Sequence, residues 1–247
     1  MSFESYRVRA IHTELFRVGQ DLGEFLVNSL ASLEPREEWI IGVTSKIVSL
    51  AEGRLVPRDS ISKTELVRRE SDVYLGEIAY DCHLTIKHGL LIPSAGIDES
   101  NSETGAYILY PEDPFASARK IHSHLCSRFS LTKLGVVITD SHTTPLRRGV
   151  TGISLAHWGF RGIANLVDHP DLFGRPLRVT SVNVADAIAG AAVFAMGEAN
   201  DQRPLAVIDG INAEFTDHGD PGEVSISREE DLYAPILKTA LVQSDPV

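Results

Sequence analysis

The stretch that decides the fold reads Leu134-Gly-Val-Val-Ile-Thr-Asp-Ser141. Its first five residues form a short apolar run, which is typical of a buried strand. Two further runs, Trp39–Val43 and Pro204–Ile208, have the same character, and residues 90–92 make a briefer one before Pro93. We therefore expect strands at all four places.

Helices are expected between these strands. Apolar residues recur at three- and four-residue steps over 20–34, a helix over about 115–130 would begin after Pro114, and small apolar residues form a stripe over 185–196. Residues 141–152 lack any periodicity, so we expect a loop there. Because strands and helices mix without regular alternation, the sequence predicts an α+β fold in a single domain.

The composition excludes several classes of protein. The chain has 247 residues, of which 43% are hydrophobic, and this is too apolar for a disordered protein. Its formal net charge of −11 argues against a general nucleic-acid binder, which would be basic. The sequence shows no membrane-spanning run and no signal peptide, so we expect a cytoplasmic protein. Its two cysteines form no CxxC pair and predict neither a disulfide framework nor a zinc site.

The charge is unevenly distributed along the chain. Residues 209–231 hold eight acidic side chains against one arginine, whereas residues 141–180 hold five arginines against two aspartates. An arginine-rich segment in an acidic chain is a candidate anion site, because the guanidinium group matches phosphate oxygens. Arginines scattered over the surface are the alternative interpretation.

Asp140 and Ser141 follow directly on the apolar run at 134–138. A carboxylate and a hydroxyl at the end of a strand, with Arg147 and Arg148 a few residues later, suit a site for metal and phosphate. Oxygen ligands of this kind are preferred by Mg²⁺ and Mn²⁺. An aspartate that caps the loop through an Asx-turn would explain Asp140 equally well.

Three further residues could contribute to such a site. Asp98 lies in a turn-like segment, Glu198 follows a helix end at Gly197, and Lys46 comes just after a buried strand. Each also has an ordinary explanation, as a turn residue or as a solvated surface charge. Taken together, three separated carboxylates and several basic groups are what two-metal phosphoryl chemistry needs.

Several motifs occur in an order that resembles one family. They are VTSKIVSLAEGR (43–54), SAGIDESN (94–101), ITDS (138–141), PLRRGVTGI (145–153), DLFGRPLRVT (171–180), VADAIAGAA (184–192) and PLAVIDGI (204–211). This set is similar to the coenzyme F-420-0:L-glutamate ligase family. The resemblance runs from about residue 5 to 212 and implies one domain over 1–247, whose segment 213–247 is an acidic loop and C-terminal region.

The resemblance implies a GTP-dependent γ-glutamyl ligase with an unusual α+β fold. It also implies an intertwined homodimer, Mg²⁺ or Mn²⁺, and K⁺. The acceptor carboxylate would attack the γ-phosphate of GTP to give an acyl phosphate, and the amine of L-glutamate would then displace phosphate to form an amide.

Matched position by position, the resemblance assigns roles to eight residues. Four would be metal ligands: Asp98, Asp140, Ser141 and Glu198. Three would contact the nucleotide: Ser45, Lys46 and Asn101. Arg147 would hold phosphate or the acceptor during catalysis. The helix at 185–196 would fit an intertwined interface, although core packing within one subunit would explain its small residues equally.

Two departures from the family pattern bear on function. Leu50 stands where the family usually has a lysine, and DSHTTPLRRG (140–149) lacks the Gly and Trp of the usual DSxGRPWRxG. The first removes a positive charge from a phosphate site, which Arg148 could offset. The second removes an aromatic ring on which a flat deazaflavin would stack.

These departures leave the acceptor and two other functions open. The leading acceptor is coenzyme F-420-0, and the alternative is a folate, whose γ-glutamyl tail needs the same bond. Leu50 would also suit a nucleotide-binding module that has lost catalysis. The three carboxylates would alternatively suit a metal-dependent hydrolase.

Overall fold

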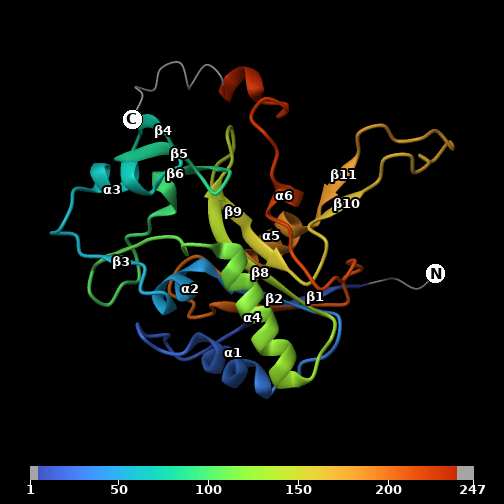
Figure 1. Ribbon diagram of the computed structural model, residues 1–247, viewed down its shortest axis with the longest axis horizontal. Coiled ribbons are helices and arrows are strands. Elements are labelled where there is room, and N and C mark those ends of the chain that lie inside the picture. Colours follow the sequence, from blue (N-terminus) through green and yellow to red (C-terminus); the bar gives the residue numbers. More distant parts are fainter. Residues whose placement is uncertain (1–4, 238–247) are drawn as a thin grey trace.

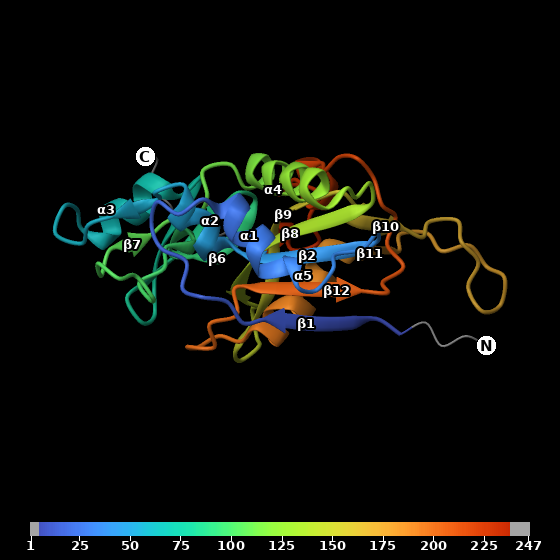
Figure 2. The same cartoon turned by 90° about the horizontal axis from the view of Figure 1, so that it is seen from below.

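The computed structural model describes residues 5–237 and is built around one mixed sheet. Its strand order is β1-β12-β2-β8-β9, from Arg7–Ile11, Leu205–Asp209, Trp39–Thr44, Leu134–Thr143 and Val150–Trp158. Strands β2 and β8 are parallel neighbours, and the other pairs are antiparallel. Figures 1 and 2 show the strands side by side with helices around them, which confirms the α+β class.

Helices cover both faces of this sheet. α1 (Leu22–Ala31), α2 (Ser45–Ala51) and α4 (Pro114–Phe129) pack on one face, and α5 (Val184–Met196) packs on the other. Alternate residues of β2 divide between the two cores, so that Ile41 faces α1 and α4 whereas Ile40 faces α5. Because both faces are buried, the central strands are continuously apolar rather than alternating.

A smaller layer lies at one end of the main sheet, at the upper left in Figure 1. It consists of α3 (Lys63–Glu70), the three-stranded sheet β4-β5-β6 (Val73–Ile78, Cys82–Lys87, Leu90–Pro93) and the short helix η1 (Ser94–Gly96). The two-residue strands β3 (Leu55–Val56) and β7 (Tyr107–Ile108) pair beside it. After η1, Asp98 forms an antiparallel bridge with Ile108 of β7.

Two other segments complete the described chain. Strands β10 (Ile163–Asn165) and β11 (Ser181–Asn183) pair at the base of an arm that projects from the body in both views (Figures 1 and 2). The acidic stretch after β12 is mainly loop and includes the short helix α6 (Pro221–Val224). Over residues 5–237, no helix has the length and apolar character needed to cross a membrane.

The prediction of a loop over residues 141–152 is mostly wrong. Strand β8 continues to Thr143 and β9 begins at Val150, so only residues 144–149 connect them. The polar residues Asp140–Thr143 pair in register with Val150–Ile153. The search for apolar periodicity misses this part of the β8–β9 hairpin because these residues extend beyond the core. Their polar side chains face a cavity instead of a packed layer.

The small residues of α5 pack within the chain itself. Ala185, Ala189 and Ala192 are fully buried against the sheet. A Cβ added at Gly152 on β9 would overlap the carbonyl oxygen of Ala189. The stripe at 185–196 is therefore accounted for by core packing, and it no longer supports a dimer interface.

Gly152→Ala is expected to destabilise the fold by about 1–3 kcal/mol, because the added methyl group forces backbone apart in a packed core. Urea unfolding would measure the change. Gly190→Ala is the matched control, since the nearest atom outside its own helix is 3.7 Å from the added Cβ. That control should stabilise the protein by up to about 1 kcal/mol through helix propensity. Equal midpoints for Gly152→Ala and the unmodified chain would contradict the close packing.

Candidate active site

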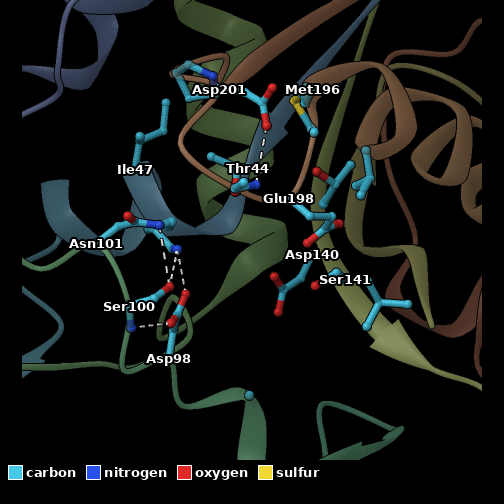
Figure 3. Close-up of a pocket in the computed structure, with 18 of the residues that line it drawn as sticks. Thr44, Ile47, Asp98, Ser100, Asn101, Asp140, Ser141, Met196, Glu198 and Asp201 are labelled. Atoms are coloured by element: carbon cyan, nitrogen blue, oxygen red, sulfur yellow. Dashed lines mark hydrogen bonds and ion pairs between the residues drawn. The ribbon is translucent and has the colours of Figure 1, made fainter.

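A cavity of about 830 Å³ opens at the carboxyl ends of the parallel strands β2 and β8. This is the position at which ligands bind in open α/β sheets. Its walls come from separate parts of the chain, among them the start of α2, the segment after η1, the end of β8 and the loop after α5. Six of the eight residues singled out from the sequence line it: Lys46, Asp98, Asn101, Asp140, Ser141 and Glu198. Figure 3 shows most of them converging from different elements.

Lys46 and Asp98 form an ion pair in this cavity. The Lys46 Nζ lies 2.6 Å from Asp98 Oδ2, and the amide of Ser100 donates to Asp98 Oδ1 at 2.6 Å. Burial raises the pKa of Asp98, but the hydrogen bond and charge of Lys46 outweigh burial and hold the pKa below its ordinary value. Asp98 is therefore ionised at neutral pH.

Asp140 is a half-buried carboxylate of the site. It lies near the end of β8, where the phenol of Tyr110 donates to its Oδ2 at 2.6 Å. Burial raises the pKa of Asp140 to about 6, although the hydrogen bond from Tyr110 acts in the opposite direction. The negative charge of Asp98 raises it further. An added cation would relieve this concentration of negative charge.

Glu198 and Ser141 complete the acidic side of the cavity. Glu198 follows Gly197, which ends α5 with a positive φ of 85°. Burial raises the pKa of Glu198, while the neighbouring hydroxyl of Ser141 and the charge of Lys46 lower it less. Figure 3 shows Glu198, Asp140 and Ser141 close together.

The donor set suits a hard divalent cation that a substrate helps to hold. Carboxylate and hydroxyl oxygens are the ligands that Mg²⁺ and Mn²⁺ prefer. Within residues 5–237, no group of three or more His, Cys, Asp or Glu side chains is placed to hold a metal ion unaided. Mg²⁺ in phosphoryl-transfer sites is usually held by one or two carboxylates together with substrate phosphates. The oxygen donors of Asp98, Asp140, Ser141 and Glu198 are thus of the type that such a cation prefers.

Ser45 and Arg147 do not line this cavity. Ser45 is a buried residue at the start of α2, and Arg147 is exposed in the turn between β8 and β9. Arg148 lies in the same turn and also outside the lining, so in this arrangement it does not replace the charge missing at Leu50. Leu50 itself is packed into the core beside the cavity.

The arginine-rich segment is not gathered into an anion site. Arg161 pairs with Glu214 and Glu223, and Arg175 pairs with Asp171. Arg175 and Arg178 belong to the projecting arm between β10 and β11, away from the cavity (Figure 1). The expectation drawn from its charge fails because proximity in sequence does not place side chains on one surface.

Three residues of the site have no distinctive sequence signal. Lys63 and Arg203 are further cations in the cavity wall, and Tyr110 lies behind it in contact with Asp140. Lys63 sits on a short helix and Arg203 in a loop, where isolated cations are common. Tyr110 precedes Pro111 in a segment without periodicity, so only the folded chain shows what its hydroxyl meets.

Comparison with known proteins finds relatives over most of the chain. The model of the F420-0:gamma-glutamyl ligase family matches residues 10–210. A coenzyme F420:L-glutamate ligase of Archaeoglobus fulgidus is 32% identical over 92% of this chain and 95% of its own length. Those of Methanopyrus kandleri and Methanocaldococcus jannaschii are 32% and 30% identical, over 81% and 93% of this chain and 84% and 98% of their own. The chain therefore belongs to the F420-0:gamma-glutamyl ligase family of amide-forming ligases.

Proposed function

We propose that this protein is a GTP-dependent ligase that joins L-glutamate, through its α-amine, to the carboxylate of coenzyme F-420-0. The observation that carries the proposal is the convergence of Asp98, Asp140, Glu198 and Lys46 at the carboxyl ends of β2 and β8. A GTP-dependent ligase must bind a triphosphate together with a divalent cation. The lysine suits the phosphates, and the three carboxylates suit the cation.

The proposed reaction has two steps. A carboxylate is a poor electrophile, so the acceptor carboxylate first attacks the γ-phosphorus of GTP, the bond to the β-phosphate oxygen breaks, and GDP leaves. The amine of glutamate then attacks the acyl carbon of the acyl phosphate, inorganic phosphate leaves, and the amine loses a proton to solvent. The product is an amide.

The residues of the cavity have distinct roles in this scheme. Lys46 would contact the phosphates as a point charge, with Asn101 beside it. Asp98, Asp140, Ser141 and Glu198 are the oxygens that would hold Mg²⁺ or Mn²⁺. A bound divalent cation supplies positive charge that stabilises the transferring phosphoryl group.

A folate is the second candidate for the acceptor. The turn over 144–149 carries no aromatic side chain, and Leu146 at its tip is fully exposed. A deazaflavin ring would gain stacking energy from an aromatic side chain at such a position. The altered turn therefore favours an acceptor that is recognised elsewhere, as a folate tail would be.

One assay separates these functions. The purified protein is incubated with GTP, Mn²⁺, L-glutamate and either F-420-0 or tetrahydrofolate, and the products are weighed by mass spectrometry. A gain of one or more glutamyl residues on one acceptor identifies it. Replacing GTP by ATP tests the nucleotide. Phosphate release without acceptor and glutamate would point to a hydrolase, and no product with either acceptor would refute the ligase proposal.

We also propose that the protein is a homodimer joined through its projecting arm. The arm exposes Leu172, Phe173 and Val179 almost completely, which is unfavourable for a monomer in water. Sedimentation of the unmodified chain should give twice the 27.0 kDa mass, and Phe173→Asp should shift it toward the monomer. A monomer in both cases would exclude the arm as an interface.

A further inference from the structure

Tyr110 is a buried residue that the proposed reaction has not used. Its side chain is 3% exposed, and its hydroxyl donates to Asp140 Oδ2 at 2.6 Å. The two residues are 30 positions apart and come from separate parts of the fold. A buried phenol aimed at one carboxylate of a cavity restricts the rotation of that carboxylate, because turning it away would leave the buried hydroxyl without its acceptor.

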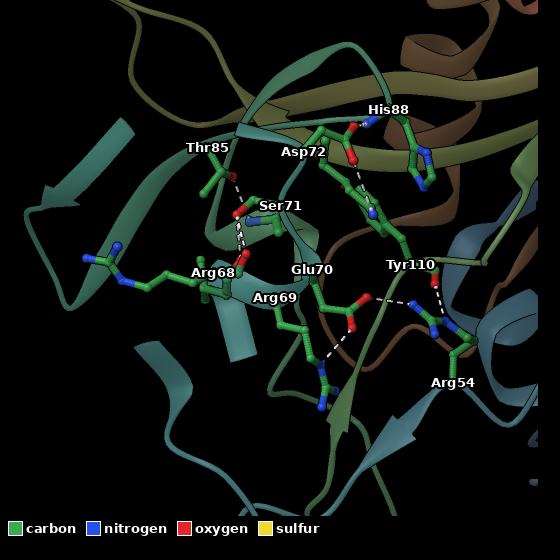
Figure 4. Close-up of polar contacts among 12 residues, drawn as sticks. Arg54, Arg68, Arg69, Glu70, Ser71, Asp72, Thr85, His88 and Tyr110 are labelled. Carbon is green, nitrogen blue, oxygen red and sulfur yellow. Dashed lines mark hydrogen bonds and ion pairs between the residues drawn. The ribbon is translucent and has the colours of Figure 1, made fainter. Parts of the chain in front are cut away.

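The position of Tyr110 is itself fixed from several directions. The Arg54 Nε donates to the backbone oxygen of Tyr110 at 3.0 Å, and the Arg54 Nη2 donates to Glu70 Oε2 at 2.7 Å (Figure 4). The ring of His88 stacks on Tyr110 with 6.3 Å between centroids. These contacts hold both the backbone and the ring of Tyr110.

Gly96 shows how closely the chain is built around this ring. It has a positive φ of 69°, and a Cβ there would overlap the ring of Tyr110. Any other residue at 96 would displace the phenol from Asp140. The contact with the Tyr110 ring therefore explains why a glycine occupies position 96.

We propose that Tyr110 is a positioning residue that orients the Asp140 carboxylate for a divalent cation. The inference rests on the metal role of Asp140 in the proposed function. Carboxylates that bind metals are usually held by hydrogen bonds from a second layer of residues, and losing such a bond typically weakens metal binding 10–100-fold.

Tyr110→Phe tests the inference, with Mn²⁺ as the metal and GDP as the nucleotide. Binding to the purified protein is followed by electron paramagnetic resonance, because the signal of free Mn²⁺ falls as the ion binds, and the fall that GDP causes without protein is subtracted. We expect affinity to fall 10–100-fold in Tyr110→Phe. Tyr107→Phe is the matched control, since Tyr107 is equally buried but its hydroxyl makes no hydrogen bond within residues 5–237.

The outcomes distinguish this inference from the proposed function. If the unmodified protein binds Mn²⁺ and Tyr110→Phe binds it within twofold, the positioning role is wrong while the metal site stands. If the unmodified protein binds no Mn²⁺, the metal role of Asp140 fails, and the inference fails with it. Equal losses in Tyr110→Phe and Tyr107→Phe would indicate a general packing effect and overturn the specific role.

A second measurement applies if Tyr110→Phe does not fold. The chain has six tyrosines, which can be labelled together as 3-fluorotyrosine. Replacing the other five singly by phenylalanine assigns the remaining ¹⁹F resonance to Tyr110. Paramagnetic Mn²⁺ at less than one equivalent should broaden the Tyr110 resonance first. A sharp Tyr110 resonance at saturating Mn²⁺ would refute the inference.

Discussion

Asp140→Asn is expected to abolish ligation and, at the same time, to make the protein more stable at pH 8. Loss of the carboxylate removes a ligand from the proposed metal site, and the charge stabilisation that such a metal supplies is worth several kcal/mol. This corresponds to a fall in turnover of about 10³-fold or more. Product formation, with whichever acceptor the assay described above identifies, would measure it.

The gain in stability follows from the raised pKa of Asp140. Burial raises this pKa from its ordinary value of 3.8 to about 6, so the folded protein favours the protonated carboxyl. The stability that the protonated group contributes is fully present below pH 3.8 and is lost as the pH rises through about 6. At 1.36 kcal/mol for each unit by which the pKa differs, about 3 kcal/mol is lost by pH 8.

Asparagine resembles the protonated carboxyl and still offers Tyr110 an acceptor oxygen. Urea unfolding in EDTA should therefore show Asp140→Asn to be more stable than the unmodified chain by up to about 3 kcal/mol at pH 8, with little difference at pH 4. Asp168→Asn is the matched control, because Asp168 is exposed on the projecting arm. Coincident unfolding curves at pH 8 would show that Asp140 is not destabilised by its burial.

A carboxylate that is needed for function can lower the free energy of unfolding, and such a gain in Asp140→Asn would be the expected sign of it. An enzyme that must hold charged groups together in a dry cavity before its ligands arrive gives up folding energy to do so. The opposite outcome, a destabilised Asp140→Asn, would assign Asp140 a structural role as the partner of Tyr110. The two measurements on this variant therefore separate a functional role of Asp140 from a structural one.

The central elements of the fold could be predicted because their sequences are periodic or continuously apolar. Strands β2, β8 and β12 and helices α1, α4 and α5 all lie where apolar runs or helical stripes indicate them. Strand β9 was not predicted, because its sequence, VTGISLAHW, mixes glycine, hydroxyl groups and histidine with apolar residues. It becomes a strand through its register with β8, which no local pattern encodes.

The site was predictable in part for a related reason. Asp140 and Ser141 follow a recognisable strand, so their place at its end could be expected from the sequence. Asp98 and Glu198 lie more than forty residues away on either side, and only the ordered motifs of the family suggested that they belong together. Arg147 was placed near the cavity by its motif, yet the extension of β8 and β9 carries its turn away. Contacts such as that of Tyr110 depend on the packing of two layers and have no signature in the sequence.

Lys46→Met should lower kcat/KM for GTP by about 10–100-fold. A hydrogen bond to a charged group contributes about 1.5–3 kcal/mol, and each 1.4 kcal/mol changes affinity tenfold. Methionine keeps the length of the side chain but removes its charge, so the proposed contact with phosphate is lost. The pKa of Asp98 should also rise, because burial raises it and the opposing charge of Lys46 is gone.

Steady-state kinetics at saturating glutamate and acceptor would measure this loss, and unfolding would show whether it reflects stability. The side chains of Lys46 and Asp98 are 25% and 35% exposed, so breaking their ion pair should change stability by less than about 1 kcal/mol. Lys87→Met is the matched control, because Lys87 lies on β5 outside the cavity and its Nζ is 3.5 Å from Asp72 Oδ1. A kcat/KM unchanged in Lys46→Met, or lowered equally in Lys87→Met, would remove Lys46 from the nucleotide site. A loss confined to Lys46→Met would support the proposed contact between Lys46 and the phosphates of GTP.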